Sequence, residues 1–236
     1  MDYSLSPLGD QAVVIELGTE ISPNTQLQIQ KITALLSKVN ETWLIEWVPA
    51  FTTVTVFYSL SKAAASAGDA LPYDFVCSRL HEWLKDPLDG DFREQRVVEV
   101  PICYGGDFGP DLPFVAEHNG LSPEEVIHIH SNGDYTVFMI GFAPGFPFIG
   151  GMSERIAAPR KKSPRLKIPA RTLGIAGKQT GIYPIETPGG WQLIGRTPIQ
   201  LFKPDSHPPT LLQAGDKIKF YPISLEEYQM LKEDHS

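Results

Sequence analysis

The sequence predicts an α+β protein with a small N-terminal α/β domain followed by a C-terminal β-barrel. The first observation is the distribution of glycine and proline: nine of the 41 lie in residues 1–100 and the other 32 in residues 101–236. The second is periodicity, because the first half alternates strand and helix patterns, whereas the second half holds many short strand candidates between turns. Residues 86–95 carry four acids, one glycine and one proline. We place the boundary there and predict domains at residues 1–90 and 91–236.

Strand and helix patterns alternate along the first half. The expected elements are, in order, a strand at 11–17, a helix from Pro23 to about Val39, a hairpin of strands at 42–48 and 52–58, a connector at 61–70 and a helix through Phe75 to Leu84. Ser22 supplies an N-cap with proline at the first helical position, and apolar residues then recur at three- and four-residue spacing. If residues 96–102 add a further strand, this half is a ferredoxin-like sandwich, an arrangement that by itself says nothing about chemistry.

The second half is expected to consist mostly of short strands. In order, we expect a strand at 97–104, helices at 112–118 and from Pro123, strands at 135–140, 173–176, 181–185, 191–196, 199–202 and 217–222, and a C-terminal helix. Ser122 with Glu125 and Ser224 with Glu227 match the capping box that begins a helix. Residues 135–140 are apolar on both faces, which predicts a buried strand. This many short strands with Gly and Pro between them favours a barrel.

The charge balance argues against two classes of partner. A formal net charge of −8 is unsuited to nucleic acid or an anionic membrane surface, because both require an excess of lysine and arginine to neutralise phosphate. The first eleven residues lack a basic start and an apolar core, and no apolar run approaches the roughly 18–20 residues that span a bilayer. Cys77 and Cys103 form neither a CxxC pair nor a disulfide framework. We therefore expect a cytoplasmic protein that binds small molecules or proteins.

Residues 141–151, which we call the aromatic stretch, combine glycine and proline with three phenylalanines and one isoleucine. More than half of these residues are Gly or Pro, which argues against a helix interior or a central strand. The apolar side chains are unusual for a solvated loop, so the stretch either packs inward to close the barrel or lines a pocket. Phe142, Pro144, Gly145 and Phe146 are its candidate binding residues, and the residues alone leave both roles open.

A basic segment follows the aromatic stretch. Residues 155–171 hold seven cations and no acid: Arg155, Arg160, Lys161, Lys162, Arg165, Lys167 and Arg171. In an acidic chain this concentration of positive charge suits a bound phosphate or carboxylate, and Arg160 and Arg165 offer planar forks for it. The alternative is a solvated loop, because charge clusters alone are weak evidence for a site.

Two further patterns concern possible ligands. The glycines at residues 189–190 lead into a strand in which Gln192 and Arg196 share one face. If that face lines the barrel interior or its mouth, Arg196 is a candidate anion ligand, whereas on a solvent face it has no such role. His128 and His130 lie about 200° apart on the expected helix, so one metal ion is not expected to bind both. We expect no metal site.

Several motifs together resemble one known family. They are GDQAVVIELG near the start, PAFTTVTVFY, VPICYGGDFGPDL, SPEEVIHIHS, IGFAPGFPFIGGM, PRKKSPRLKIPARTLGIAGKQTGIYPIETPGGWQLIGRTP and AGDKIKFYPI. These segments span almost the whole chain and closely resemble the allophanate hydrolase subunit 1 family. The resemblance implies a cyclophilin-like β-barrel after a small N-terminal α/β domain, which agrees with the boundary placed above.

The same resemblance implies a role in a multi-subunit enzyme. The family includes the B subunit of the bacterial ATP-dependent 5-oxoprolinase, which opens 5-oxo-L-proline to L-glutamate together with C-type and A-type 5-oxoprolinase subunits as partners. The implied cofactor is ATP, accompanied by Mg²⁺, and such a site needs cations and backbone N–H groups aimed at developing negative charge. The catalytic candidates are Arg160, Arg165, Arg196 and Gln179. The substrate or partner-binding candidates are Phe142, Pro144, Gly145, Phe146, Tyr183, Trp191 and His130.

The resemblance leaves other functions open. The family also includes an inhibitor of a sporulation sensor histidine kinase, in which the apolar loop and the barrel would dock on the kinase and block its autophosphorylation. Both roles can coexist in one protein. Proteins of the allophanate hydrolase or urea carboxylase type are a further alternative. A prolyl isomerase activity rests on fold analogy alone, and a fold does not confer an activity.

Overall fold

The computed structural model describes residues 2–20, 22–85 and 96–234. The chain divides into two compact units, Met1–Glu94 and Gln95–Ser236. The boundary predicted at residues 86–95, with its division between 90 and 91, lies outside the described residues and stays a prediction. Within the described part of the chain, every helix is too short or too polar to cross a bilayer.

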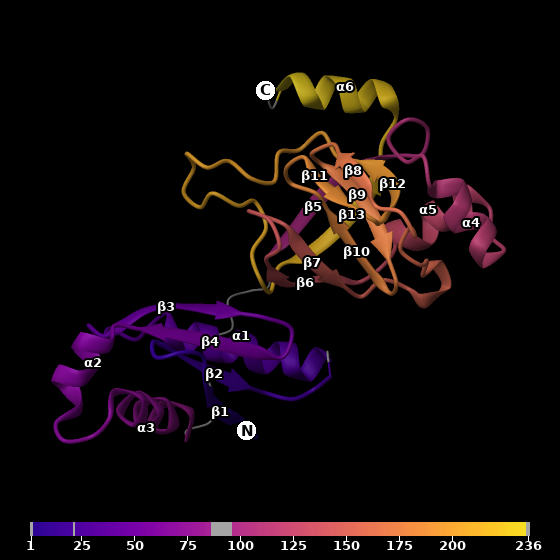
Figure 1. The fold of residues 1–236 in the computed structure, drawn as a ribbon. Helices are drawn as coiled ribbons and strands as arrows, with labels where there is room; N and C mark the ends of the chain where they lie inside the picture. Colours follow the sequence, from indigo (N-terminus) through magenta and orange to yellow (C-terminus); the bar gives the residue numbers. More distant parts are fainter. Residues whose placement is uncertain (1, 21, 86–95, 235–236) are drawn as a thin grey trace. The chain divides into compact units, whose positions relative to one another are not determined.

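The first unit is a four-stranded antiparallel sheet with three helices (Figure 1). Its strands have the order β1-β2-β4-β3. The elements are β1 (Ser4–Pro7), β2 (Ala12–Glu16), α1 (Pro23–Leu36), β3 (Leu44–Pro49), β4 (Thr53–Tyr58), α2 (Leu60–Ala67) and α3 (Pro72–Lys85). Alternate residues of the central strands, such as Val54 and Val56 of β4, are fully buried in the core of this unit. The other face of each strand is more exposed, which is the pattern of a sheet covered on one side.

Two predictions for this unit are wrong. Residues 61–70 are not a connector, because an alanine-rich helix, α2, occupies most of them, and alanine is the strongest helix former. Residues 96–102 do not complete the sheet, because β5 (Val97–Tyr104) belongs to the barrel. The edge beside β2 is filled instead by β1, which the sequence patterns did not predict. A ferredoxin-like arrangement closed by that later strand is therefore ruled out.

The second unit contains a closed seven-stranded barrel, which confirms the predicted architecture of this half. The strand order is β10-β7-β6-β13-β5-β12-β9, and β13 and β5 form a parallel pair. Its strands are β5, β6 (Tyr135–Ile140), β7 (Pro147–Gly150), β9 (Thr172–Ala176), β10 (Gln179–Ile182), β12 (Gln192–Arg196) and β13 (Lys217–Pro222). A separate antiparallel ribbon is formed by β8 (Arg165–Ile168) and β11 (Thr187–Gly189). Residues 199–202 were predicted as a strand but form only an isolated bridge from Phe202 to Thr210.

Three helices and a single helical turn accompany the barrel. They are α4 (Leu112–Asn119), α5 (Pro123–Ser131), the 3-10 turn η1 (Glu154–Ile156) and α6 (Leu225–Asp234). Figure 1 shows α4 and α5 side by side at one flank of the barrel. The capping box of Ser122 and Glu125 is present, as predicted. Ser224 and Glu227 also exchange their two capping hydrogen bonds, so both helix starts are confirmed.

The aromatic stretch contains a barrel strand, contrary to the prediction. Residues 147–150 form β7, which pairs with β6 on one side and with β10 on the other. Pro147 is tolerated because it is the first residue of the strand, the position where a missing N–H costs least. Residues 141–146, which precede this strand, form a loop in which Phe142 is exposed and Phe146 is buried.

Candidate functional site

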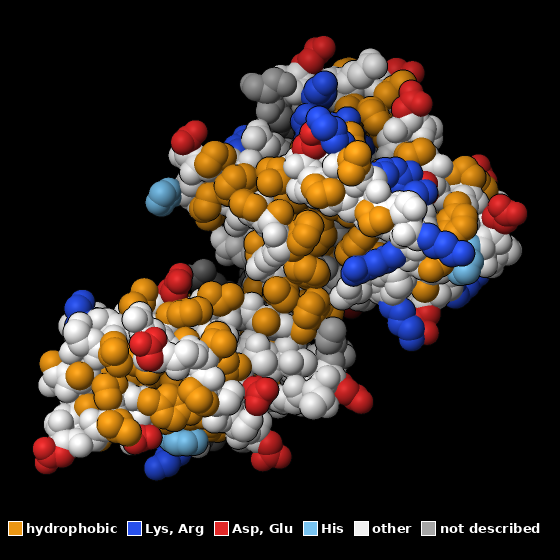
Figure 2. Space-filling model, in the orientation of Figure 1, with side chains coloured by type: hydrophobic (Ala, Val, Ile, Leu, Met, Phe, Trp, Pro, Cys, Tyr) orange, Lys and Arg blue, Asp and Glu red, His pale blue; other side chains and the backbone are white. Residues whose placement is uncertain are grey.

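A pocket of about 320 Å³ lies on the outer surface of the barrel unit. Its lining combines aromatic rings, prolines and glycines with one cation: Phe142, Phe146, Phe148, Arg160, Pro164, Tyr183, Pro188, Gly189, Gly190 and Trp191. The residues come from the loop after β6, from β7, and from the segments that flank the β8–β11 ribbon. Figure 2 shows hydrophobic side chains gathered on the visible face of the barrel unit with Lys and Arg side chains beside them. Five of the predicted site residues meet in this pocket.

Phe146 is the centre of the aromatic wall. Its side chain is 2% exposed, and its ring meets four others at centroid distances of 5.1–5.8 Å and steep angles: Phe142, Phe148, Tyr183 and Trp191. Edge-to-face pairs of this kind contribute about 0.5–1.5 kcal/mol each beyond the area they bury. These ring contacts therefore stabilise the wall.

The loop before Phe146 holds Phe142 in an uncommon conformation. Phe142 has a φ of 69° and Gly145 a φ of 76°. The turn is closed by hydrogen bonds from Gly141 N to the Phe146 carbonyl (3.0 Å) and from Phe146 N to the Ala143 carbonyl (3.0 Å). A left-handed backbone is costly for phenylalanine by about 1–2 kcal/mol. This strained conformation places the Phe142 ring, which is 69% exposed, at the rim of the pocket.

Two glycines pack against the aromatic wall, although neither of them lines the pocket. Gly174 of β9 and Gly181 of β10 pair across the two strands. A Cβ atom at Gly181 would lie 3.1 Å from Trp191 Cζ3 and 3.2 Å from Phe146 Cζ, and one at Gly174 would lie 3.1 Å from Trp191 Cβ. The two rings therefore lie close to bare backbone, and side chains at these positions would displace them.

Arg160 is the cation of the pocket. Its side chain is exposed, and among the described residues no carboxylate lies within ion-pair distance of its guanidinium. Burial raises the pKa of Tyr183 to about 12, although the charges of Arg160 and Arg165 favour its ionised form. The Tyr183 hydroxyl stays protonated at neutral pH. The pocket thus combines the permanent positive charge of Arg160 with aromatic walls that are neutral.

Asp111 is a site residue that the sequence patterns missed. Its side chain is 6% exposed, and Oδ2 accepts a hydrogen bond from Leu193 N (2.7 Å). Oδ1 accepts from Arg165 Nη2 (2.8 Å) and from Lys161 Nζ (3.3 Å). Burial alone raises the pKa of Asp111, but the hydrogen bonds from Arg165 and Leu193 and the two nearby cations lower it below its ordinary value. The carboxylate therefore stays ionised.

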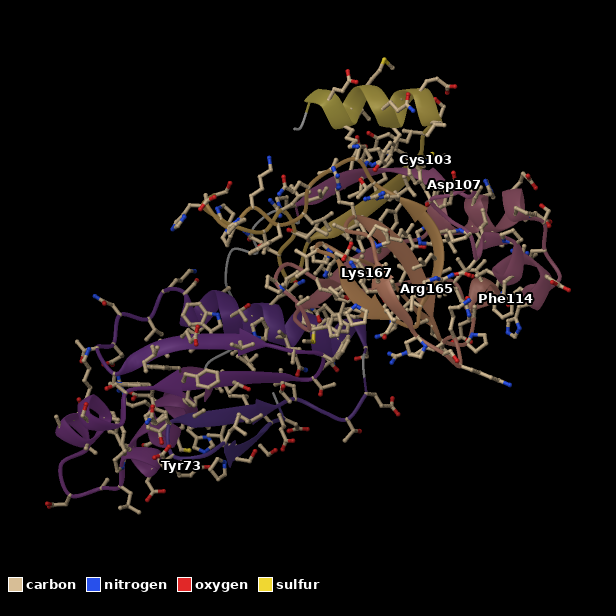
Figure 3. All side chains as sticks on the ribbon, turned by 45° about the horizontal axis from the view of Figure 1, so that its top comes forward. Tyr73, Cys103, Asp107, Phe114, Arg165 and Lys167 are labelled. Atoms are coloured by element: carbon tan, nitrogen blue, oxygen red, sulfur yellow. The ribbon has the colours of Figure 1, made fainter. Side chains whose placement is uncertain are left out.

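Asp111 joins the two chain segments that flank the pocket. Lys161 N donates to the Gly190 carbonyl (2.7 Å), and Arg165 Nη1 approaches the Trp191 carbonyl at 3.5 Å. Arg165, labelled in Figure 3, donates to the Asp111 carboxylate and is not among the residues that line the pocket. It connects the basic segment to Trp191, the residue directly before β12.

The other predicted site residues lie away from the pocket. Arg196 donates from Nε to the Ala170 carbonyl (3.0 Å), and its guanidinium lies over the Phe108 ring at 5.7 Å. Gln179 begins β10 opposite Ala176. Pro144 and Gly145 lie in the loop that carries Phe142 but are not among the lining residues, and Gly145 packs against the base of Phe202.

His130 is a residue of the barrel interior rather than of the pocket. It is fully buried on α5, with Nδ1 2.8 Å from the Tyr104 hydroxyl and Nε2 3.0 Å from Thr180 Oγ1. Thr180 Oγ1 itself donates to the Gly174 carbonyl (3.0 Å). The histidine is therefore protonated on Nε2 and accepts from Tyr104 on Nδ1. Burial lowers its pKa to about 3.

We expect His130 to make stability depend on pH. Its pKa is about 3 when folded and about 6.5 when unfolded, so the unfolded chain binds the extra proton between these values. Above about pH 6.5 the imidazole is neutral in both states and does not change the free energy of unfolding. Below that pH, the free energy of unfolding falls by about 1.4 kcal/mol per pH unit. Urea unfolding at pH 7.5 and 5.5 measures this: wild type should lose about 1.4 kcal/mol more than the variant His130→Asn. Equal losses in the two proteins would contradict the assignment.

Comparisons with known proteins agree on one family. The family model described as "Carboxyltransferase domain, subdomain C and D" matches residues 3–212. The chain is 51% identical to the B subunit of 5-oxoprolinase from Bacillus subtilis (strain 168), over 98% of each chain. It is 40% identical to the B subunit of 5-oxoprolinase from Escherichia coli O157:H7, over 91% of this chain and 94% of that protein. The crystal structure of TTHA0988 has a TM-score of 0.76 and 31% identity, covering 91% of this chain and 40% of that chain.

Proposed function

The chain belongs to the family described as carboxyltransferase domain, subdomain C and D, and from this premise we propose that it is the B subunit of a 5-oxoprolinase complex. The observation that carries the proposal is 51% identity to the Bacillus subtilis protein over 98% of both chains. Such a complex opens the lactam ring of 5-oxo-L-proline to L-glutamate as ATP is hydrolysed. We further propose a cytoplasmic location and a cyclophilin-like class for the barrel.

The pocket supports this role through its chemistry. Opening a lactam with ATP begins with phosphorylation of the ring carbonyl oxygen, which needs a dry, preorganised environment and a cation for the anionic substrate. Phe146 and Trp191 exclude water from the inner wall, and Arg160 supplies the cation. Arg165 and Asp111 keep the walls in place. Arg196, Gln179 and His130 are not among the residues that line this pocket.

The lining residues do not suit ATP with Mg²⁺. A nucleoside triphosphate is normally held by several backbone N–H groups, a lysine and a metal ion that carboxylates bind. The described lining offers one guanidinium and no carboxylate, and no group of three metal-binding side chains occurs among the described residues. We therefore propose that ATP binds to a partner protein of the complex and not to this pocket.

C-type and A-type 5-oxoprolinase subunits complete the proposed enzyme as partners of this chain. The rim residue Phe142 is 69% exposed and Leu166 of β8 is 89% exposed. Exposed apolar side chains beside a pocket suit a protein interface. The related TTHA0988 chain is more than twice as long as the part of it that matches this chain. In that protein, the matching part is therefore joined to further sequence.

Reconstitution tests the proposal. The chain is co-purified with A-type and C-type 5-oxoprolinase subunits from the same source, and ADP release is measured with and without 5-oxo-L-proline. We expect hydrolysis that depends on 5-oxoproline and on this chain, with L-glutamate as product. Equal ATP hydrolysis without 5-oxoproline, or the same rate without this chain, rules the function out. Allophanate and urea, offered to the same complex, test the substrates of related enzymes.

A second candidate function is inhibition of a sensor histidine kinase. The exposed ring of Phe142 favours it, because an aromatic side chain at the rim of an apolar pocket is a typical anchor for a protein partner. A direct assay of kinase autophosphorylation tests it. Micromolar protein should slow the reaction, and Phe142→Ala should relieve the effect; no slowing by the wild-type chain removes this role.

A further inference from the structure

We propose that the aromatic pocket binds the ring acid of the reaction, 5-oxo-L-proline, through its carboxylate, and that it excludes the nucleotide. This inference rests on the proposed function and names the ligand of the pocket. The pocket combines apolar walls with the guanidinium of Arg160, which has no carboxylate partner among the described residues.

The walls suit a small, compact ring. Trp191 is 7% exposed and Tyr183 is 2% exposed, so both present ring surface rather than mobile side chains to the pocket. Besides the five aromatic rings and Arg160, the lining consists of two prolines and two glycines. The volume of about 320 Å³ lies at the low end of the range of about 300–1,000 Å³ found for small-molecule sites. A five-membered lactam can lie against the rings without large polar groups meeting them.

The charges suit one carboxylate. Three cations lie at or next to the pocket, but Lys161 and Arg165 both contact the buried carboxylate of Asp111 at 3.3 and 2.8 Å. Arg160 has no such partner among the described residues. A guanidinium binds a carboxylate through two parallel hydrogen bonds. The pocket is therefore matched to a ligand with a single negative charge.

The same charges disfavour a triphosphate. Its phosphates would contact aromatic rings and one arginine, and the carboxylate of Asp111 is already bound to Arg165, Lys161 and Leu193 N. Desolvating several negative charges against apolar walls is unfavourable unless each is paired. The nucleotide must therefore approach from another chain, with the ring acid held by this one.

The assembled complex tests the proposal through the two Michaelis constants. In Arg160→Gln we expect the KM for 5-oxo-L-proline to rise at least tenfold and the KM for ATP to change less than twofold. Arg160→Lys should recover part of the affinity, because it restores the charge without the planar fork. The control is Lys167→Gln, which removes an exposed cation paired with Glu186 at 3.2 Å and outside the lining. It should leave both constants unchanged.

The opposite split overturns the proposal. A rise in the KM for ATP with an unchanged KM for 5-oxoproline would place the nucleotide here, and two unchanged constants would remove Arg160 from any site. Pyrrolidin-2-one, which lacks the carboxylate, should not compete with 5-oxoproline in the wild-type complex. If the wild-type complex has no 5-oxoproline-dependent activity, the proposed function fails by itself. Calorimetric titration of the chain with 5-oxo-L-proline and with ATP then decides the ligand of the pocket.

Discussion

Replacing Asp111 by asparagine lowers the free energy of unfolding by about 2 kcal/mol and raises the KM for 5-oxo-L-proline. The amide keeps an acceptor for Leu193 N, but it loses the charge that binds Arg165 and Lys161. Weakening a buried, charge-assisted network costs about 1–3 kcal/mol, and the partial exposure of both cations places this case in the middle of that range. The segment that carries Arg160 is then less firmly held, so binding weakens as well.

Urea unfolding and steady-state kinetics measure the two effects of Asp111→Asn. The matched control is Asp107→Asn in the preceding loop, because Asp107 is exposed and its substitution removes the same charge (Figure 3). The control should change stability by less than about 0.5 kcal/mol and leave KM unaltered. A purely structural role for Asp111 predicts lower stability with an unchanged KM, and that outcome would refute its positioning role.

Replacing Phe146 by alanine lowers the free energy of unfolding by about 3–5 kcal/mol, as expected for a large core side chain. Its ring contacts four other rings and is 2% exposed. Phe142→Ala in the same loop should cost less than about 1 kcal/mol, because that ring is 69% exposed. Relief of its left-handed backbone is not expected, since alanine is strained there too.

Thermal or urea unfolding of the two variants checks this contrast. If Phe146→Ala does not fold, Phe146→Leu keeps most of the volume and should cost about 1 kcal/mol while raising the KM for 5-oxoproline. Similar losses of stability at positions 142 and 146 would contradict the description of Phe146 as the centre of the wall.

Local signals in the sequence were sufficient for much of the fold. The capping boxes at Ser122 and Ser224 are confirmed. They could be predicted because all the groups that form each box lie within four consecutive residues. The strand at 217–222 is also confirmed with the same bounds. β7 was missed because Gly and Pro surround it, and only its neighbours β6 and β10 make it a strand. β1 is short and lies at a sheet edge, so its own sequence carries little signal.

Only those parts of the site that leave a local signal in the sequence were predicted. The aromatic stretch and the basic segment are visible as local concentrations of residue types, and the pocket brings Phe142, Phe146 and Arg160 together. The contact between Asp111 and Arg165 spans 54 residues, and no local pattern reveals it. Gln192 and Arg196 were predicted to share one face of a strand because side chains alternate between faces. A register shift between Leu193 and Gly195 interrupts that alternation.

The most direct test of this account is a ¹⁹F NMR titration of the complex with 5-fluorotryptophan in this chain alone. The chain has four tryptophans, and Trp191 is the one in the barrel unit, whereas Trp43, Trp47 and Trp83 belong to the first unit. The variant Trp191→Phe assigns its resonance. We predict that 5-oxo-L-proline shifts the Trp191 resonance in a saturable way and leaves the other three in place, and that ATP alone does not shift it. A Trp191 resonance that is unchanged at saturating 5-oxoproline, or that responds to ATP alone, would contradict it.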